Sequence, residues 1–479
     1  MGIFLVRTRK GPNSAINAMP YISGKYYPVR RIVFFLTEGV LIFSALVLMH
    51  LVFLGQEQFI DAVTVSVLRS GLVAVIFQLS LYFFDLYDLN VYSSFADTAT
   101  RMTQAFGFGC IVLSGLYYLF PVVIIPLSIF WAGYFVICGA LAAWRFFYVI
   151  ALGRRFFAQP IIILGCGDLA GCIVHEVVDS LDSGYKIVAI VGGGEPQYDL
   201  HRIPFFRLGE RKLDDLCGEY QAEMVIVALE DRRGTMPVEE LIECKLDGVD
   251  IEAGIGFYEE LASKLMVEKV NPDWIIFSQG FTIGRMNKVG KRFFDLALSA
   301  VGLILASPLM LLSAIVIKLE SPGAIFYTQD RVGERGETFQ VIKFRSMCQD
   351  AEKDGAVWAK KNDSRVTRFG NLIRKLRIDE IPQLFNVLKG EMSLVGPRPE
   401  RPVFVKELAK KIPYYALRHN IKPGVTGWAQ VCYPYGASEE DALRKLEYDL
   451  YYLKNLSLIM DLWIVFKTVK TVLFQKGAR

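Results

Sequence analysis

The chain has 479 residues, of which 53% are hydrophobic and 13% aromatic. This length exceeds one domain, and this apolar content excludes an ordinary soluble protein. The formal net charge of +4, from 53 bases and 49 acids, selects no class of partner, and we expect no nucleic acid among the partners. The composition therefore predicts a membrane protein with soluble parts.

Four apolar stretches lie near the N-terminus, and each has about the 20 residues that a transmembrane helix needs. They cover residues 32–54, 63–84, 102–120 and 122–144. No small-residue cleavage site follows them, so we interpret them as anchors and not as a signal peptide. Residues 1–150 are thus expected to form a four-helix transmembrane region.

Basic residues predict how this region is oriented, because the cytoplasmic flanks of membrane helices carry the excess of Lys and Arg. Six bases precede the first stretch, whereas residues 55–62 contain two acids and no base. The N-terminus is therefore expected inside, and four crossings return the chain to the cytoplasm, where Arg145, Arg154 and Arg155 follow the fourth stretch. The polar residues in or near these helices are interpreted as helix–helix or interfacial contacts. They are Glu38, His50, Arg69 and Gln78.

Residues 151–270 alternate between strand-like and helix-like segments, which predicts a small parallel, Rossmann-like α/β domain. The segment 160–170 reads PIIILGCGDLA and has the form of a buried strand, a glycine turn and the start of a helix. Further strands are predicted at 186–191 and 224–229, and a helix at 238–246.

The glycine turn places Gly165, Gly167 and Ala170 at the G-x-G-x-x-A spacing that allows close approach to a phosphate. This pattern is weak alone, because the acid expected at the end of the second strand is replaced by the glycines 192–194, with Glu195 the nearest candidate. A structural or regulatory role is favoured over dinucleotide binding, and both interpretations stay open.

A linker is expected at 271–290, and residues 293–317 form a fifth apolar segment long enough to span a bilayer. By length alone, a plain fifth transmembrane helix is favoured. Ser307 and Pro308 lie past its middle, and proline favours a kink because it removes a helix hydrogen bond. The chemistry downstream favours a re-entrant helix that bends there and leaves on the face it entered, since both flanks are basic.

Asp379 and Glu380 form an acidic pair just behind the basic segment 360–377. Such a segment attracts phosphates, and adjacent carboxylates can hold a divalent cation or attack a phosphorus atom that cations have made electrophilic. The alternative is a solvated helix face with charge pairs one turn apart. The pair alone does not separate these two interpretations.

Seven motifs follow one another within residues 291–430. They read KRFFD, SPGAIFY, QDRVG, KFRSM, RIDEIPQ, SLVGPRPE and KPGVTGWAQ. In this order they resemble the bacterial sugar transferase family, the monotopic polyprenyl-phosphate phosphoglycosyl transferases. The N-terminal part resembles the large members of that family, which start exopolysaccharide or O-antigen repeat units. Residues 291–479 are therefore expected to form a mainly α-helical catalytic domain.

The resemblance implies a reaction in which a sugar 1-phosphate moves from a UDP-sugar to undecaprenyl phosphate, with release of UMP. Asp379 would attack the sugar-linked phosphorus to give an aspartyl phosphosugar, which the lipid phosphate then displaces. Glu380 would help to hold Mg²⁺ or handle a proton, and Asp379 is a second candidate ligand of that metal. The resemblance also implies an active site on the cytoplasmic face of the bacterial inner membrane, and a homodimer.

The candidate substrate-binding residues share positive charge or a stiffened loop. They are Lys343, Arg345, Arg377, Pro397, Arg398 and Pro399. Arg398 is expected to contact the uridine nucleotide, and Lys343 and Arg345 to face one phosphate site from a strand. The last two could also be exposed strand charges, and the prolines only a stiff loop. Two alternatives remain for the C-terminal tail 446–474, which is expected to lie on the bilayer or to pack against the catalytic core.

No residue selects the sugar, and a hexose is preferred only on likeness to the large family members. Two other functions compete. A membrane-anchored nucleotide-sugar dehydratase needs a Tyr with a Lys four residues later, and that spacing occurs only at Tyr21 and Lys25, ahead of the first membrane helix. A non-catalytic scaffold for polysaccharide assembly is disfavoured by the intact pair Asp379 and Glu380.

Overall fold

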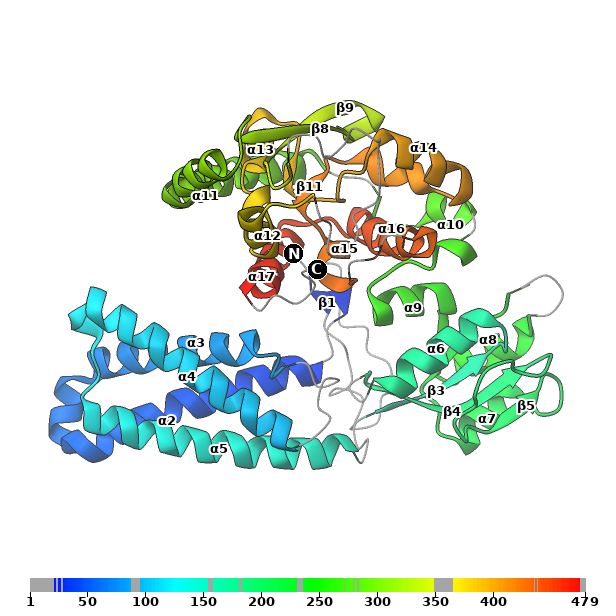
Figure 1. Ribbon diagram of the computed structural model, residues 1–479. Helices are drawn as coiled ribbons and strands as arrows, with labels where there is room; N and C mark the ends of the chain where they lie inside the picture. The colour runs from blue at the N-terminus through cyan, green and yellow to red at the C-terminus, as the bar shows by residue number, and fades with distance from the viewer. Residues whose placement is uncertain are drawn as a thin grey trace. The chain divides into compact units, whose positions relative to one another are not determined.

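The structure is a computed structural model, and its chain divides into two compact units, Met1–Phe257 and Tyr258–Arg479 (Figure 1). It describes residues 21–22, 25–26, 29–87, 95–153, 158–180, 183–230, 236–270, 272–278, 280–281, 284–348, 365–434, 436 and 438–473. Arg154, Arg155 and residues 360–364 of the basic segment lie outside these ranges, as do the first 20 residues. Each unit is described by itself.

The first unit begins with a short antiparallel pair, β1 (Tyr21–Ile22) and β2 (Lys25–Tyr26), and continues into four long apolar helices. These are α2 (Val29–Asp61), α3 (Val63–Phe83), α4 (Phe95–Leu119) and α5 (Leu127–Gly153). All four are long and apolar enough to cross a membrane, which confirms the four predicted stretches. The last helix begins at Leu127 and not at 122, because the 3₁₀ turn η2 (Pro121–Val123) and Pro126 precede it.

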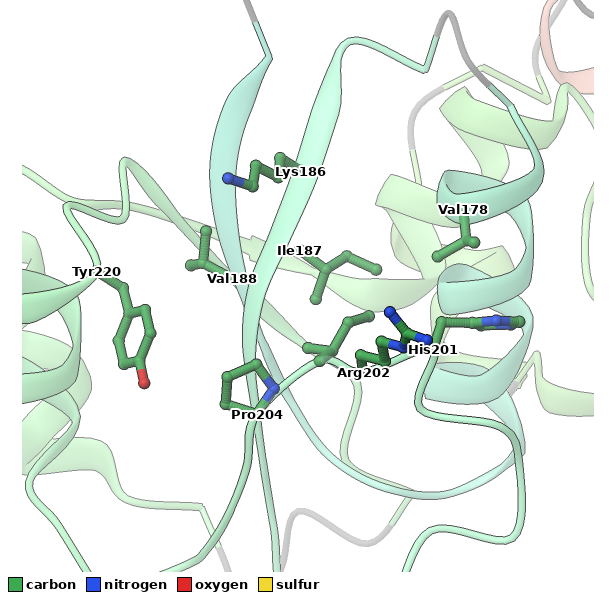
Figure 2. A pocket seen from close by; sticks show the side chains of 9 residues that line it. Val178, Lys186, Ile187, Val188, His201, Arg202, Pro204 and Tyr220 are labelled. Atoms are coloured by element: carbon green, nitrogen blue, oxygen red, sulfur yellow. The ribbon is translucent and has the colours of Figure 1, made fainter. Parts of the chain in front are cut away.

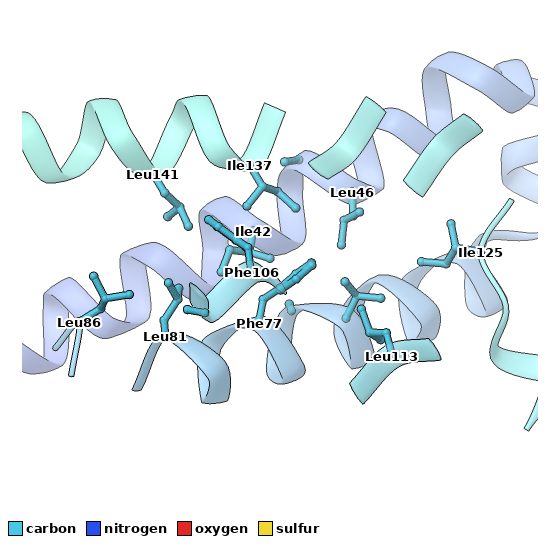
Figure 3. Packing of buried hydrophobic residues seen from close by; sticks show 14 of the residues in the cluster. Ile42, Leu46, Phe77, Leu81, Leu86, Phe106, Leu113, Ile125, Ile137 and Leu141 are labelled. Carbon is cyan, nitrogen blue, oxygen red and sulfur yellow. The ribbon is translucent and has the colours of Figure 1, made fainter. Parts of the chain in front are cut away.

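The helix bundle packs around a core of aliphatic and aromatic side chains, with Ile42, Phe77, Phe106 and Ile137 near its centre (Figure 3). The four polar residues of these helices make contacts inside the bundle, and those of Glu38 and Gln78 join two helices, as predicted. Buried Glu38 pairs with Arg145 at 2.8 Å, and His50, Arg69 and Gln78 contact the carbonyls of Leu46, Val122 and Phe35. Ionisable groups inside this bundle therefore join its helices.

A five-stranded parallel sheet follows the bundle. Its strands are β3 (Gln159–Leu164), β4 (Tyr185–Gly192), β5 (Phe205–Arg207), β6 (Met224–Val227) and β7 (Asp250–Ala253). They lie in the order β5-β4-β3-β6-β7, so the chain moves outward from β3 in one direction and then in the other. The helices are α6 (Asp168–Asp179), α7 (Leu213–Glu219), α8 (Val238–Leu246) and α9 (Gly254–Ala262), the last of which spans the boundary between the units.

The second unit is mainly helical and contains two small sheets (Figure 1). Its helices are α10 (Pro272–Phe277), α11 (Arg285–Glu320), α12 (Arg368–Lys375), α13 (Gln383–Lys389), α14 (Pro402–Lys411), α15 (Trp428–Cys432), α16 (Glu439–Lys454) and α17 (Leu458–Leu473). Short 3₁₀ turns are η3 (Val267–Lys269), η4 (Glu334–Gly336), η5 (Ile378–Glu380) and η6 (Tyr415–Asn420). Strands β8 (Phe326–Val332) and β9 (Thr338–Phe344) pair antiparallel, whereas β10 (Ser393–Val395) and β11 (Gly424–Thr426) pair parallel.

The α11 helix is continuous through Ser307 and Pro308. Proline lacks the N–H that would reach the carbonyl of Ile304 four residues earlier, and the Ser307 hydroxyl donates to that carbonyl at 2.8 Å instead. The Ser-Pro pair thus satisfies the backbone inside an apolar segment. Large apolar side chains around this position, such as Leu305 and Leu311, are exposed.

Both ends of α11 contact the same folded unit. Near its start, the Asp295 carboxylate accepts hydrogen bonds from the Ser393 hydroxyl and the Leu394 N–H, both at 3.0 Å. Near its end, Ile317 is buried against Phe344 and Ile373. The apolar middle of α11 therefore lies between two points at which the helix is fixed to one body.

The C-terminal helices α16 and α17 pack into the largest core of this unit, together with Trp428 and Tyr452. Met460, Asp461 and Ile464 of α17 are buried, whereas Ile459 and Leu462 are exposed. Of the two alternatives for the tail, packing against the core is confirmed for one face. Trp428 is buried in this core, and its Nε1 donates to the Ser263 carbonyl at 3.0 Å.

Candidate active site

A tight turn between α12 and α13 presents the acidic pair. Thr367 caps α12 through its hydroxyl, which accepts from the Gly370 N–H at 2.9 Å. The helix ends at Lys375, and Arg377 adopts a left-handed conformation with φ of 56°. This backbone is uncommon for a residue with a side chain and redirects the chain into η5, which carries Asp379 and Glu380. The two carboxylates therefore lie on a short and fixed segment.

Glu380 is buried and lies at the centre of a cluster of cations. Its Oε1 accepts from Lys343 Nζ at 3.1 Å and from Arg398 Nη2 at 2.7 Å, and Arg377 Nη1 lies 4.0 Å away. Burial alone would raise the pKa of Glu380, but Arg398 and Lys343 outweigh burial and hold this pKa well below its usual range. Glu380 is therefore a fixed anion that joins β9, η5 and the loop after β10.

Asp379 lies in a different environment although it is adjacent in sequence. It is buried, and its Oδ1 accepts no hydrogen bond from any described residue. Burial and the Glu380 charge raise the pKa of Asp379 to about 6, while Lys343 and two arginines, Arg374 and Arg377, oppose the rise. A buried and weakly solvated carboxylate next to three cations suits attack on an anionic phosphorus centre.

The loop that follows β10 is fixed by side chains that donate hydrogen bonds to backbone carbonyls at its two ends. Val395 O accepts from Lys291 Nζ at 3.0 Å, and Pro399 O accepts from Arg331 Nη1 at 3.0 Å. A Cβ on Gly396 would lie 2.4 Å from the Lys422 carbonyl, so only glycine fits there. The Arg398 side chain can therefore reach Glu380 from a loop whose backbone is fixed on both sides.

The structure brings only some of the predicted residues together. Lys343, Arg377 and Arg398 converge on Glu380, and Pro397 and Pro399 flank Arg398. Arg345 does not join them, because its guanidinium donates to the Ser321 and Pro322 carbonyls and to the Ser321 hydroxyl. The strand alternation that placed Lys343 and Arg345 on one face does not apply, since β9 ends at Phe344.

Some residues of this site were not predicted individually from the sequence, and Arg374 was included only in the basic segment 360–377. Arg374 donates from Nε to the Ser346 hydroxyl at 2.8 Å and lowers the pKa of Asp379. Its position one turn before the acidic pair was the available signal. Arg331 and Lys291 fix the loop of Arg398, and both lie in motifs that had been noted for the resemblance only.

The carboxylates of Asp379 and Glu380 are suitable ligands for Mg²⁺. The described residues contain no group of three or more His, Cys, Asp or Glu side chains that could hold a metal. Asp379 and Glu380 nevertheless offer the one or two carboxylates with which proteins usually hold Mg²⁺ beside substrate phosphates. The Asp379 Oδ1 atom, which has no hydrogen-bond donor among the described residues, is a hard oxygen ligand of the required kind.

In the first unit, the Glu230 side chain occupies the space beside the glycine turn that follows β3. Gly165 has φ of 137°, and a Cβ there would lie 2.3 Å from the Ala228 carbonyl. The α6 helix starts after Gly167, and its first N–H, that of Asp168, donates to Glu230 Oε1 at 3.2 Å. The Glu230 carboxylate thus stands at the helix N-terminus where a phosphate would bind, while Ala170 is buried in α6.

A cavity of about 480 Å³ lies elsewhere on this domain, along the amino-terminal half of β4 (Figure 2). Lys186, His201, Arg202 and Tyr220 contribute its polar groups, and Ile187 and Val188 of β4 contribute apolar ones. The glycine turn follows the carboxyl end of β3, so the cavity and the turn lie at opposite ends of the parallel sheet. The cavity is therefore separate from the glycine turn.

Comparison with known proteins gives three close likenesses. Residues 286–475 match the family model described as bacterial sugar transferase. The UDP-N-acetylgalactosamine-undecaprenyl-phosphate N-acetylgalactosaminephosphotransferase of Aeromonas hydrophila is 36% identical over 343 residues, which cover 72% of this chain and 73% of the relative. The undecaprenyl-phosphate glucose phosphotransferase of Komagataeibacter xylinus is 33% identical over 380 residues, covering 72% and 70%.

A third relative matches a shorter part of the chain. The UDP-glucose:undecaprenyl-phosphate glucose-1-phosphate transferase of Xanthomonas campestris is 42% identical over 193 residues, which are 40% of each chain. The first two likenesses extend beyond the catalytic motifs into the N-terminal unit, since they span more than two thirds of both chains. The resemblance seen in the motifs is confirmed, and the chain, a bacterial membrane protein with five apolar helices among its described residues, belongs to the bacterial sugar transferase family of enzymes.

Proposed function

We propose that this protein transfers a sugar 1-phosphate from a UDP-sugar to undecaprenyl phosphate through a covalent intermediate on Asp379. An Asp379 carboxylate oxygen attacks the sugar-linked phosphorus, and the bond from that phosphorus to the bridging oxygen of UMP breaks. UMP leaves, and an aspartyl phosphosugar remains. A phosphate oxygen of the lipid then attacks the same phosphorus, and the Asp379 carboxylate is released.

The observation that carries this proposal is the contrast between the two adjacent carboxylates. Glu380 is neutralised by Lys343 and Arg398, whereas Asp379 Oδ1 is buried without a hydrogen-bond donor among the described residues. A carboxylate committed to ion pairs is a poor nucleophile, and a weakly solvated one is a better nucleophile. The geometry thus favours Asp379 as the attacking group and Glu380 as the residue that positions the cations.

Mg²⁺ is the metal we propose, held by Asp379 or Glu380 together with the diphosphate of the substrate. When bound, it would offset the negative charge of the two phosphates. Three cations of the chain, Lys343, Arg377 and Arg398, converge on Glu380 next to Asp379 and would offset the same charge. Arg398 is proposed to contact the nucleotide half.

The α11 helix is proposed to be re-entrant, with the active site on the cytoplasmic face of the inner membrane. Asp295 and Ile317 are about 30 Å apart along a straight helix, which is the thickness of a hydrocarbon core. A helix that crossed the bilayer would separate them onto opposite faces. Both residues contact the same folded unit, and this supports entry and exit on one face.

Cysteine labelling from outside the cell membrane tests this topology. In a variant without its eight natural cysteines, Ala324→Cys should resist a membrane-impermeant maleimide in intact spheroplasts and react after lysis, because it follows α11 on the cytoplasmic side. Gln58→Cys, at the exposed end of α2, is the positive control and should react in intact spheroplasts. Labelling of Ala324→Cys before lysis would show that α11 crosses the membrane.

The pH dependence of turnover tests the ionisation of Asp379. Its pKa of about 6 predicts that kcat/KM falls as the pH drops through 6, since the protonated carboxyl cannot attack. Lys343→Met removes a cation that lowers this pKa, so the acidic limb should move to higher pH by about one unit. Lys406→Met, on the exposed face of α14, should leave the limb in place. A limb that stays fixed in Lys343→Met would contradict the assignment.

The sugar is best found by a screen of UDP-sugars scored by UMP release. A hexose is our preference, and the names of the relatives divide between glucose and N-acetylgalactosamine. Release of UMP that requires both undecaprenyl phosphate and one UDP-sugar would support the proposed reaction. Absence of turnover with every UDP-sugar, in a preparation that is folded and membrane-embedded, would contradict it.

We propose a membrane part at 1–150, a Rossmann-like domain at 151–270, a linker at 271–290 and a catalytic part at 291–479. The strand order β5-β4-β3-β6-β7 supports the second assignment, because it is the order of a doubly wound dinucleotide-binding fold. Leu265 and Val267 pack in the core of the C-terminal unit, so that unit begins before the proposed linker. A homodimer is expected, and sizing in nanodiscs tests it.

A further inference from the structure

Arg418 and Asp449 form a buried ion pair behind the loop that carries Arg398. Arg418 lies in η6 and is 5% exposed, and Asp449 lies in α16 and is 1% exposed. Arg418 Nη2 is 2.7 Å from Asp449 Oδ2, and Nη1 donates to the Tyr415 hydroxyl at 2.7 Å. A buried ion pair of this kind usually contributes no more to the free energy of unfolding than a well-packed pair of apolar side chains. The burial of these two charges therefore points to a role of this pair other than stability.

The same guanidinium reaches the loop. Arg418 Nη2 donates to the Arg398 carbonyl at 3.1 Å, while the Arg398 side chain donates to Glu380 at 2.7 Å. One residue thus has its backbone fixed by Arg418 and its side chain fixed by the anion next to Asp379. The neighbouring Pro399 carbonyl is held by Arg331, which leaves the loop little freedom to shift.

We infer that Arg418, held by Asp449 and Tyr415, is a positioning residue that sets the place of Arg398 for the UDP-sugar. The inference rests on the proposed role of Arg398 in binding the nucleotide. Lysine cannot replace Arg418, because a single ammonium group cannot span Asp449, Tyr415 and the Arg398 carbonyl in a fixed plane. A shift of about 1 Å in a substrate-positioning group can lower a rate on the order of 10²-fold.

The matched control lies on the same helix. Glu447 is also buried on α16, and it pairs with Arg444 at 2.9 Å, but among the described residues neither side chain hydrogen-bonds or forms an ion pair with the loop of Arg398. Asp449→Asn and Glu447→Gln each remove the charge of a buried α16 carboxylate, although Arg444, the partner of Glu447, is 34% exposed and Arg418 only 6%. Only the first leaves Arg418 without its anion. The two variants therefore share the loss of a buried carboxylate charge on α16 and differ in the link to Arg398.

Steady-state kinetics of the full chain in nanodiscs tests the inference. Arg418→Lys and Asp449→Asn should raise the KM for the UDP-sugar about 10-fold or more and leave the KM for undecaprenyl phosphate unchanged. Glu447→Gln should leave both KM values unchanged. Tyr415→Phe removes a single hydroxyl that accepts from Arg418, and it should also raise the KM for the UDP-sugar. This milder variant still tests the inference if the other variants do not fold.

A double-mutant cycle separates this inference from the proposed function. If Arg418 acts through Arg398, the double variant Arg398→Ala with Arg418→Lys should have the kcat/KM of Arg398→Ala alone. Losses that multiply, or KM changes shared equally by both substrates and by Glu447→Gln, would overturn the positioning role. Normal kinetics of Arg398→Ala itself would instead overturn the proposed role of Arg398, whatever Arg418 does.

Discussion

Asp379→Asn should abolish Mg²⁺-dependent release of UMP, with a loss of at least about 10³-fold in kcat. Asparagine has nearly the shape of aspartate but has no anionic oxygen to attack phosphorus. The Lys343, Arg377 and Arg398 cluster around Glu380 stays intact, so substrate binding should change far less than turnover. Glu407→Gln, on the exposed face of α14, should turn over normally. Near-normal release of UMP by Asp379→Asn would remove the covalent mechanism.

The same variant should be no less stable than the parent, and this separates loss of chemistry from loss of fold. The pKa of Asp379 is raised from 3.8 to about 6 by burial, so the folded state binds the proton more tightly than the unfolded state does. Ionised Asp379 therefore destabilises the fold, by an amount that grows between pH 3.8 and 6 and stays constant above it. At 1.36 kcal/mol per pKa unit this is about 3 kcal/mol at most, and asparagine removes it.

Glu380→Gln should lower kcat/KM by about 10²-fold or more, for a different reason. The variant leaves Lys343 and Arg398 without the anion that fixes their position, and so disorders the phosphate-binding cations. It also removes the charge that raises the pKa of Asp379, so the acidic limb of the pH profile should move to lower pH. This shift is opposite in sign to that expected for Lys343→Met.

Glu380→Asp and added Mg²⁺ complete this test. Aspartate keeps the charge and should recover part of the activity with the acidic limb near its parental position. If Glu380 acted only as a metal ligand, excess Mg²⁺ should restore Glu380→Gln. If it positions Lys343 and Arg398, excess Mg²⁺ should leave the deficit in place, and full rescue by the metal would contradict that role.

The sequence predicted the membrane helices well because length and apolar content alone define them. The start of the fourth was predicted too early, because the 3₁₀ turn at Pro121–Val123 and Pro126 delay the helix to Leu127. The two carboxylates were recognised as a pair, but their opposite pKa shifts were not predictable. Those shifts depend on Lys343, which lies 37 residues before Glu380, and on Arg398, which lies 18 residues after it.

Long-range contacts also explain why Arg345 does not lie in the cluster where the sequence predicted it. Arg345 resembled a phosphate ligand because strand alternation put it beside Lys343, yet the strand ends one residue earlier and Arg345 fixes the Ser321 and Pro322 carbonyls. Arg418 carried no local signal at all, since its partners are Asp449 in another helix and the backbone of Arg398. Motifs thus located the site, and the fold assigned the separate roles within it.

The central claim is that the sugar phosphate is carried on Asp379, and trapping that intermediate tests it most directly. The purified full chain is incubated with Mg²⁺ and the accepted UDP-sugar but without undecaprenyl phosphate, quenched, and analysed by intact-protein and peptide mass spectrometry. The account predicts a stoichiometric burst of UMP and one sugar-phosphate adduct on the peptide that contains Asp379, absent from Asp379→Asn and lost when undecaprenyl phosphate is added. An adduct on another residue, or the same adduct in Asp379→Asn, would contradict it.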